Sequence, residues 1–164
     1  MRAELIIVEL VKLALQFSGA LIVARLAVKW ALNRYKSEKT WERQLSAYAD
    51  AVTAISEMRL VVGRWIDDEI ENKQASEERN AEHAQRYRSA RRRLEEGLAA
   101  AVLILPNQTS DGLKQLMIDI DNAGRGDNYL DDLESQYSLL NQTSNDLIEQ
   151  GRKYLGLGST EIIK

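Results

Sequence analysis

Residues 45–66 read LSAYADAVTAISEMRLVVGRWI, and their apolar side chains recur at intervals of three and four residues. In an α-helix this spacing places the side chains along one face, as it does in helical bundles. The repeating positions are Leu45, Tyr48, Val52, Ile55, Met58 beside Arg59, Val62, and Trp65 beside Ile66. The stretch therefore predicts an amphipathic helix whose apolar face needs other helices to cover it.

A second amphipathic helix is predicted after the polar residues 72–76. Its repeating positions are Ala84, Tyr87, Arg91, Leu94, Leu98, Ala101 and Leu105. Ser76 is suited to cap its N-terminus, and Glu77 and Glu78 follow where the helix dipole favours acidic side chains. Because only a short turn separates this helix from residues 45–66, we expect the two helices to pack antiparallel.

The rest of the chain predicts two further helices. Pro106 ends the preceding helix, and Thr109 or Ser110 is expected to cap a short one. Its inward positions are Leu113, Leu116, Met117 and Ile120. After a glycine-containing loop at residues 124–128, a last helix runs to about residue 155 without a break at residues 141–144. Its repeating positions are Leu130, Leu133, Tyr137, Leu140, Ser144, Leu147, Gly151 and Tyr154.

Length and composition restrict the classes of protein to consider. A chain of 164 residues fits one domain that can bury a core of its own. It contains no cysteine, which excludes disulfides, thiolate metal sites and cysteine nucleophiles. The net charge of −3 gives no electrostatic reason to expect nucleic acid as a partner.

An apolar segment, residues 5–32, precedes the predicted bundle, and nearly every position in it is Leu, Ile, Val or Ala. Charged residues interrupt it at Glu9, Lys12, Arg25 and Lys29, so the longest uncharged run is residues 13–24. A bilayer core takes about 20 predominantly apolar residues, and shorter runs are more typical of buried or interfacial helices. Aromatic and basic residues follow, as at the cytoplasmic boundary of a membrane span; they are Trp30, Arg34, Tyr35, Lys36 and Lys39.

Several interpretations of this segment stay open. As a membrane span over residues 5–24, it leaves the bundle in the cytoplasm, with Glu9 and Lys12 as helical neighbours that can pair. As a helix buried between subunits, it hides charges that lie on two different sides. As a secretory signal it would be unusual, because charges interrupt its apolar region. The residues expected to contact a membrane or another subunit are Leu13, Leu15, Phe17, Leu21, Ile22 and Trp30.

The sequence offers no set of residues suited to catalysis or metal binding. His83 is the only histidine and lies in a charged stretch, so we expect a solvated side chain without a catalytic role. No Glu-x-x-His pair of the kind that binds metals in helical bundles occurs. We therefore expect a protein that is not an enzyme, with no cofactor, no metal and no small-molecule substrate.

A basic cluster is the strongest local charge feature. It consists of Arg86, Arg88, Arg91, Arg92 and Arg93. One interpretation is a patch for an anionic partner such as phosphate or acidic lipid. The other is a solvated face, because glutamates flank the cluster on both sides, and this second interpretation is favoured.

The residues after the apolar segment resemble a loosely defined group of small bacterial membrane-anchored helical proteins. The pattern is Lys-x-Glu-x-x-Trp-Glu-Arg-x-x-x-x-Tyr, here residues 36–48, with an apolar Leu-x-Leu-Pro turn at residues 103–106. This resemblance implies a non-enzymatic role in a bacterial inner membrane, in some cases in a prophage or antiviral-defence setting. The chain departs from the group at Glu9 and Lys12, which lie where the anchor is otherwise apolar.

Taken together, these observations predict an all-α chain in which a long apolar N-terminal helix precedes an antiparallel bundle of about four helices. The predicted parts are residues 1–36 as anchor or oligomerising helix, 37–158 as bundle and 159–164 as tail. The expected function is interaction with a protein partner or with itself, at the inner membrane with the bundle in the cytoplasm. Two alternatives are a cytoplasmic homo-oligomer and a membrane-perturbing effector in which residues 9 and 12 line a polar path between copies.

Overall fold

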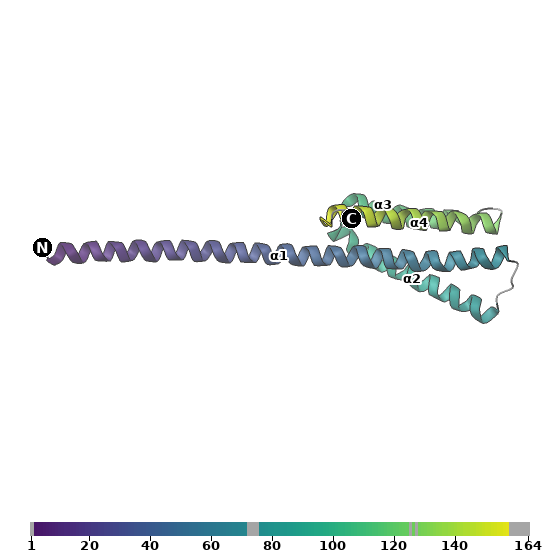
Figure 1. The fold of residues 1–164 in the computed structure, drawn as a ribbon, viewed down its shortest axis with the longest axis horizontal. Helices are drawn as coiled ribbons and strands as arrows, with labels where there is room; N and C mark the ends of the chain where they lie inside the picture. Colours follow the sequence, from purple (N-terminus) through teal and green to yellow (C-terminus); the bar gives the residue numbers. More distant parts are fainter. Residues whose placement is uncertain (1, 72–75, 125, 127, 158–164) are drawn as a thin grey trace, which may run out of the picture. The chain divides into compact units, whose positions relative to one another are not determined.

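The computed structural model describes residues 2–71, 76–124, 126 and 128–157; the side chains of residues 2–17, 19 and 20 are not described. Four helices make up this part of the chain: α1 (Arg2–Ile70), α2 (Glu77–Ile104), α3 (Asn107–Ala123) and α4 (Tyr129–Tyr154) (Figure 1). The chain divides into two compact units, Met1–Thr40 and Trp41–Lys164. The prediction of an all-α fold with a long first helix is therefore confirmed.

The first helix, α1, spans both the apolar segment and the first bundle segment. The sequence left open whether the helix of residues 5–32 continues through residue 37 into residues 45–66, and in the structure α1 includes both segments. No proline or glycine occurs between residues 20 and 62, so nothing in the local sequence interrupts the helix. The C-terminal part of α1 therefore supplies one of the bundle helices, and four helices in all are described rather than an apolar helix plus about four.

Within the second unit, side-chain contacts show the direction of each helix. Along α1, Gln44, Glu57 and Arg64 meet residues 104, 93 and 83 of α2, so α1 and α2 are antiparallel. Along α4, residues 151, 141 and 137 meet residues 48, 59 and 63 of α1, again in antiparallel order. Arg91 binds Asp121, and Thr109 binds Gln150, which makes α3 antiparallel to both α2 and α4. The arrangement is an up-down-up-down bundle.

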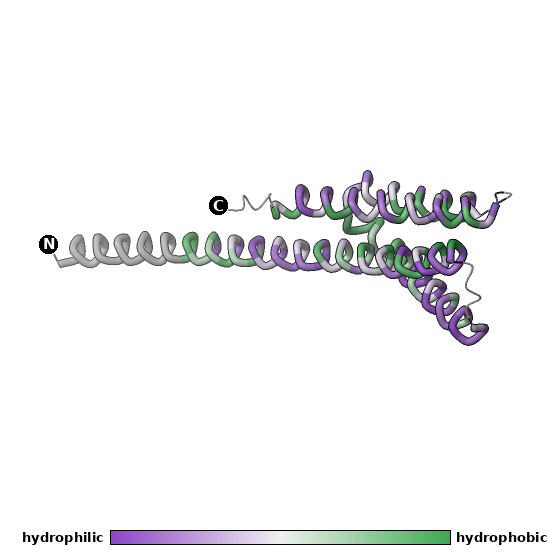
Figure 2. The backbone as a smooth tube through the Cα atoms, turned by 45° about the vertical axis from the view of Figure 1, so that its right-hand side comes forward, coloured by the Kyte–Doolittle hydropathy of each residue, from purple (hydrophilic) through white to green (hydrophobic). Residues whose placement is uncertain are grey.

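The buried core agrees with the predicted apolar faces. Ile55, Met58 and Val62 of α1 are fully buried, and Leu94 of α2 packs in the same cluster. The other helices contribute Leu113, Leu116 and Ile120 from α3 and Leu133, Leu140 and Leu147 from α4. Green and purple alternate along α3 and α4 in Figure 2, as expected for helices with one buried face. Tyr137 and Tyr154, predicted to face inward, are instead exposed.

The predicted N-terminal cap of α2 is confirmed, and the predicted cap of α3 is wrong. Ser76 caps α2, because its hydroxyl accepts a hydrogen bond from the backbone N–H of Arg79. The predicted capping role of Thr109 or Ser110 is wrong: α3 begins at Asn107, directly after Pro106. Both hydroxyl side chains are buried inside the first turns of α3, where they bond to other groups.

Candidate functional site

Eight large apolar side chains between residues 21 and 35 of α1, within the first unit, are exposed. Leu21 and Ile22 are 63% and 61% exposed, and Trp30 is 69% exposed. Further exposed apolar side chains on this helix are Val23, Leu26, Val28, Leu32 and Tyr35. These are the side chains that a core would bury, and no described residue of the first unit covers them.

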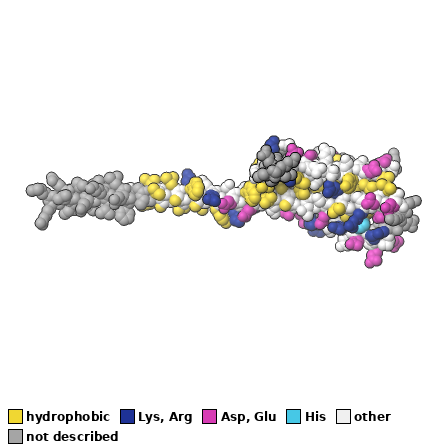
Figure 3. Space-filling model, in the orientation of Figure 1, with side chains coloured by type: hydrophobic (Ala, Val, Ile, Leu, Met, Phe, Trp, Pro, Cys, Tyr) yellow, Lys and Arg dark blue, Asp and Glu magenta, His cyan; other side chains and the backbone are white. Residues whose placement is uncertain are grey.

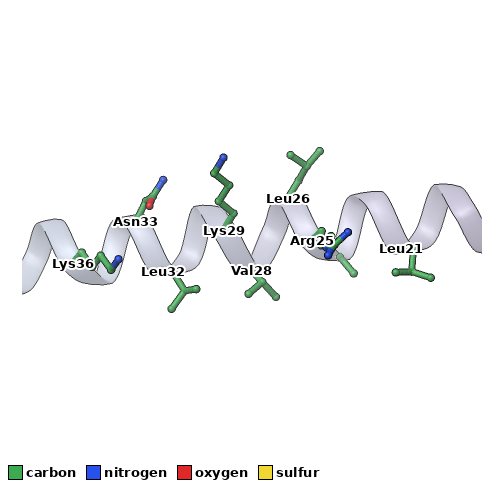
Figure 4. A pocket seen from close by; sticks show the side chains of 9 residues that line it. Leu21, Arg25, Leu26, Val28, Lys29, Leu32, Asn33 and Lys36 are labelled. Atoms are coloured by element: carbon green, nitrogen blue, oxygen red, sulfur yellow. The ribbon is translucent and has the colours of Figure 1, made fainter.

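Three of the four charged residues between positions 21 and 36 lie on one side of this helix, and Arg34 lies on the opposite side. At about 100° per residue, Arg25, Lys29 and Lys36 fall within about 40° of one another. Figure 4 shows Lys29 and Asn33 on one side of the helix and Val28 and Leu32 on the other. All residues that line the shallow hollow drawn there belong to α1 alone, so it is an open helix surface without opposing walls. The apolar surface therefore covers most of the circumference.

Aromatic and basic side chains lie together where this apolar surface ends. The guanidinium of Arg34 is 5.9 Å from the centre of the Trp30 ring, within the range of a cation–π contact. Arg34 also forms an ion pair with Glu38, with 3.0 Å between Nε and Oε1. Side chains of this kind are typical of a membrane–water interface, although exposed pairs contribute little to stability.

The structure describes the side chains of only half of the residues predicted to contact a membrane or another subunit. Leu21, Ile22 and Trp30 are described, and all three are exposed. Leu13, Leu15 and Phe17, like Glu9 and Lys12, lie outside the described side chains. Within the described part of the chain, no helix is long and apolar enough to cross a membrane.

The predicted basic cluster on α2 is largely paired with acidic groups. Arg91 binds Glu95 and Asp121 at 3.1 and 2.8 Å, Arg92 binds Glu96 at 2.8 Å, and Arg93 binds Glu57. Burial lowers the pKa of Arg91, but its bonds to the two carboxylates outweigh that effect and raise it overall. Arg86 and Arg88 are exposed and form no ion pair with a described residue. Figure 3 shows blue Lys and Arg side chains gathered beside the cyan His, with magenta Asp and Glu side chains around them.

The expectation of a solvated His83 is wrong. Its side chain is only 6% exposed, because α2 packs against α1 at this level and directs residue 83 toward Arg64. The Nε2 atom lies 3.4 Å from Nη1 of Arg64, while Nδ1 has no hydrogen-bond partner among the residues that the structure describes. A guanidinium can only donate, so Nε2 accepts and Nδ1 carries an unpaired buried proton. This arrangement provides neither a carboxylate to orient the ring nor a nucleophile beside it.

A polar network that the sequence did not reveal joins three helices. The Tyr48 hydroxyl lies 3.0 Å from Oγ1 of Thr109, which in turn donates to Oε1 of Gln150 at 2.9 Å. These groups form part of the wall of an open hollow between α3 and α4 that also includes Asp146 and Lys153. Because the hydroxyls bond to one another and to an amide, no base activates either of them as a nucleophile. Residue spacing along the sequence could not have predicted this network, because the network depends on the register of three helices relative to one another.

Among the described residues, no group of three His, Asp or Glu side chains is placed to hold a metal ion.

Comparison with known proteins assigns neither a family nor a function to this chain. No protein family matches this chain, no curated protein resembles it, and no solved structure matches its fold. The exposed apolar surface of α1 therefore remains the candidate site.

Proposed function

We propose that this chain is a non-enzymatic, membrane-anchored helical protein that acts by binding a protein partner or a second copy of itself. One observation carries the proposal: large apolar side chains surround α1 from Leu21 to Tyr35 and stay exposed. Burying such a side chain contributes about 1.5–3 kcal/mol, and soluble monomers rarely expose large continuous apolar surfaces. A lipid bilayer can cover the whole circumference of this helix at once.

The polar residues on this helix support a bilayer as the covering. Arg25 and Lys29 share one side and have long apolar stems, so their charges can reach the headgroups while the stems stay in the hydrocarbon. Arg34, Lys36 and Lys39 follow the apolar stretch, and such a basic flank favours the cytoplasmic side. The proposal therefore places the apolar helix in a bacterial inner membrane and the bundle in the cytoplasm.

Fractionation of cells that express the full-length chain tests this proposal. After washes with high salt and alkaline carbonate, the protein should stay in the membrane pellet and be released only by detergent. Replacing Leu26 and Trp30 together by Glu should move it to the supernatant. The matched control is Leu60→Glu, because Leu60 is a comparably exposed apolar side chain on the bundle part of α1. Recovery of the unmodified chain in the supernatant would overturn the proposal.

A second candidate is a homo-oligomer whose copies cover one another's α1. The observation in its favour is that Leu21, Val28 and Tyr35 recur every seven residues, with Ala24 and Ala31 between them. This candidate predicts a discrete multimer in solution without detergent, measured by multi-angle light scattering. A monomer under those conditions would eliminate it.

A further inference from the structure

The C-terminal third of α2 exposes apolar side chains on the bundle itself. Residues 97–105 read GLAAAVLIL, a run without a polar side chain. Leu103 is 84% exposed, more than any other large hydrophobic residue described, and Val102 beside it is 41% exposed. Figure 2 shows α2 changing from hydrophilic at its start to hydrophobic toward its end. A single exposed leucine is ordinary, but this one lies within two helical turns of an apolar hollow.

That hollow lies along the same stretch of α2, where α2 meets α1. It has a volume of 240 Å³, and its apolar lining includes Ala47 and Ala51 of α1, Gly97, Ala100 and Ile104 of α2, and Leu113 of α3. A Cβ atom added to Gly97 would meet nothing within 4 Å, so the space above this residue is open. No contact with a described residue therefore requires glycine there.

We propose that this surface binds the same surface of a second copy, with Leu103 of each chain entering the hollow above Gly97 of the other. Gly97 and Leu103 are each three residues from Ala100. A twofold axis that passes close to Ala100 therefore brings both leucines over both glycines simultaneously. Such a contact is self-complementary, which is what a symmetric dimer requires.

The side chains around this contact suit close approach of two helices. Ala100 is small and exposed, so two copies of α2 can cross at this residue with little between their backbones. Arg43, Asp50 and Arg93 also line the hollow, and Arg93 is paired with Glu57. Arg43 and Asp50 carry opposite charges, so no excess of like charge opposes a second copy. The inference rests on the proposed function, since it names a second copy as the partner through which the chain acts.

Cysteine cross-linking tests the contact, because the native chain has no cysteine. In the full-length chain, Ala100→Cys places two thiols at the twofold axis, where their Cβ atoms can come within the distance of a disulfide. The control is Ser138→Cys, an exposed position on α4 away from the contact. Under mild oxidation we expect at least about fivefold more disulfide-linked dimer for the first variant than for the second. Equal yields would overturn the inference.

A second variant tests how the surfaces fit together. Gly97→Gln in the Ala100→Cys background fills the space that Leu103 should occupy, and it should reduce the dimer to the level of the Ser138→Cys control. The bundle should stay folded, because a Cβ atom added at residue 97 meets nothing within 4 Å and glutamine favours a helix more than glycine does. An undiminished dimer yield with an unchanged circular dichroism spectrum would contradict the proposed fit.

The same samples distinguish a failure of the α2 contact from a failure of the proposed membrane anchor. Each variant is fractionated before oxidation, so the pellet reports membrane attachment and the gel reports the α2 contact. Protein that pellets without cross-linking contradicts the α2 contact and leaves the anchor in place. Protein that cross-links in the supernatant contradicts the anchor and supports the contact between copies.

Discussion

At the scale of single residues, His83 is a polar group whose burial the bundle does not compensate. Among the described residues its Nδ1 atom has no hydrogen-bond partner, and its one hydrogen bond there, to Arg64, is long. A buried unsatisfied group costs about 1–3 kcal/mol, whereas an apolar replacement of similar shape carries no such cost. We predict that His83→Leu raises the free energy of unfolding by about 1 kcal/mol, measured by urea denaturation. The exposed residue Gln85 provides the control, Gln85→Leu; a less stable His83→Leu would show that the ring serves the fold.

Tyr87 makes the stability of the bundle sensitive to alkaline pH. Burial raises the pKa of its hydroxyl above the ordinary value of 10.0, and the charge of Arg91 only partly offsets this. The unfolded chain therefore loses its proton first as the pH rises above 10, so stability falls until the pH passes the native pKa. Below pH 10 no such loss exists. We predict that Tyr87→Phe makes stability less dependent on pH in that range, measured by chemical denaturation at a series of pH values.

Substitution of a second tyrosine, Tyr129, tests whether the alkaline loss of stability is due to Tyr87. Burial also raises the pKa of Tyr129, although this side chain is exposed over more than half of its surface. Tyr129→Phe should therefore change the alkaline decline less than Tyr87→Phe. The reverse order would contradict the burial of Tyr87 between α1 and α2.

At the scale of helices, two glycines have opposite roles. A Cβ atom at Gly151 of α4 would lie 3.2 Å from Cδ1 of Tyr48, whose ring is buried and hydrogen-bonded to Thr109. A Cβ atom at Gly112 of α3 would meet nothing within 4 Å. Since alanine favours a helix over glycine by about 0.5–1 kcal/mol, we predict that Gly112→Ala stabilises the bundle by about that amount. Gly151→Ala should instead destabilise it, because the Tyr48 ring has little room to move; thermal melts compare the two, and equal gains would refute the close packing of α1 and α4.

The helices themselves were predictable because their signals are local. The intervals of three and four residues identified Ile55, Leu94 and Leu140 as core positions, and the Ser76 cap followed from residue type. The burial of His83 and the network around Thr109 were not predictable. Both depend on the register of neighbouring helices, which decides which residues lie opposite these two side chains. The exposed surface of α1 was only partly predictable: composition revealed the apolar residues, but whether other helices cover them is a tertiary property.

At the scale of the whole molecule, the central claim is that a bilayer covers the apolar surface of α1. The chain has three tryptophans, and they lie in different environments. Trp30 is on the exposed apolar helix, Trp41 begins the bundle unit, and Trp65 packs against Tyr87 at 5.5 Å between ring centres. Variants that keep one tryptophan and replace the other two by phenylalanine therefore report each environment separately.

The most direct measurement is the quenching of tryptophan fluorescence by brominated lipids, with the full-length chain reconstituted into vesicles. Retaining Trp30 alone should give blue-shifted emission that the brominated chains quench strongly, because the proposed anchor holds this ring at the hydrocarbon boundary. Retaining Trp65 alone should give emission that is barely quenched, because this ring is packed within the bundle. Quenching of Trp30 no greater than that of Trp65 would contradict the membrane anchor.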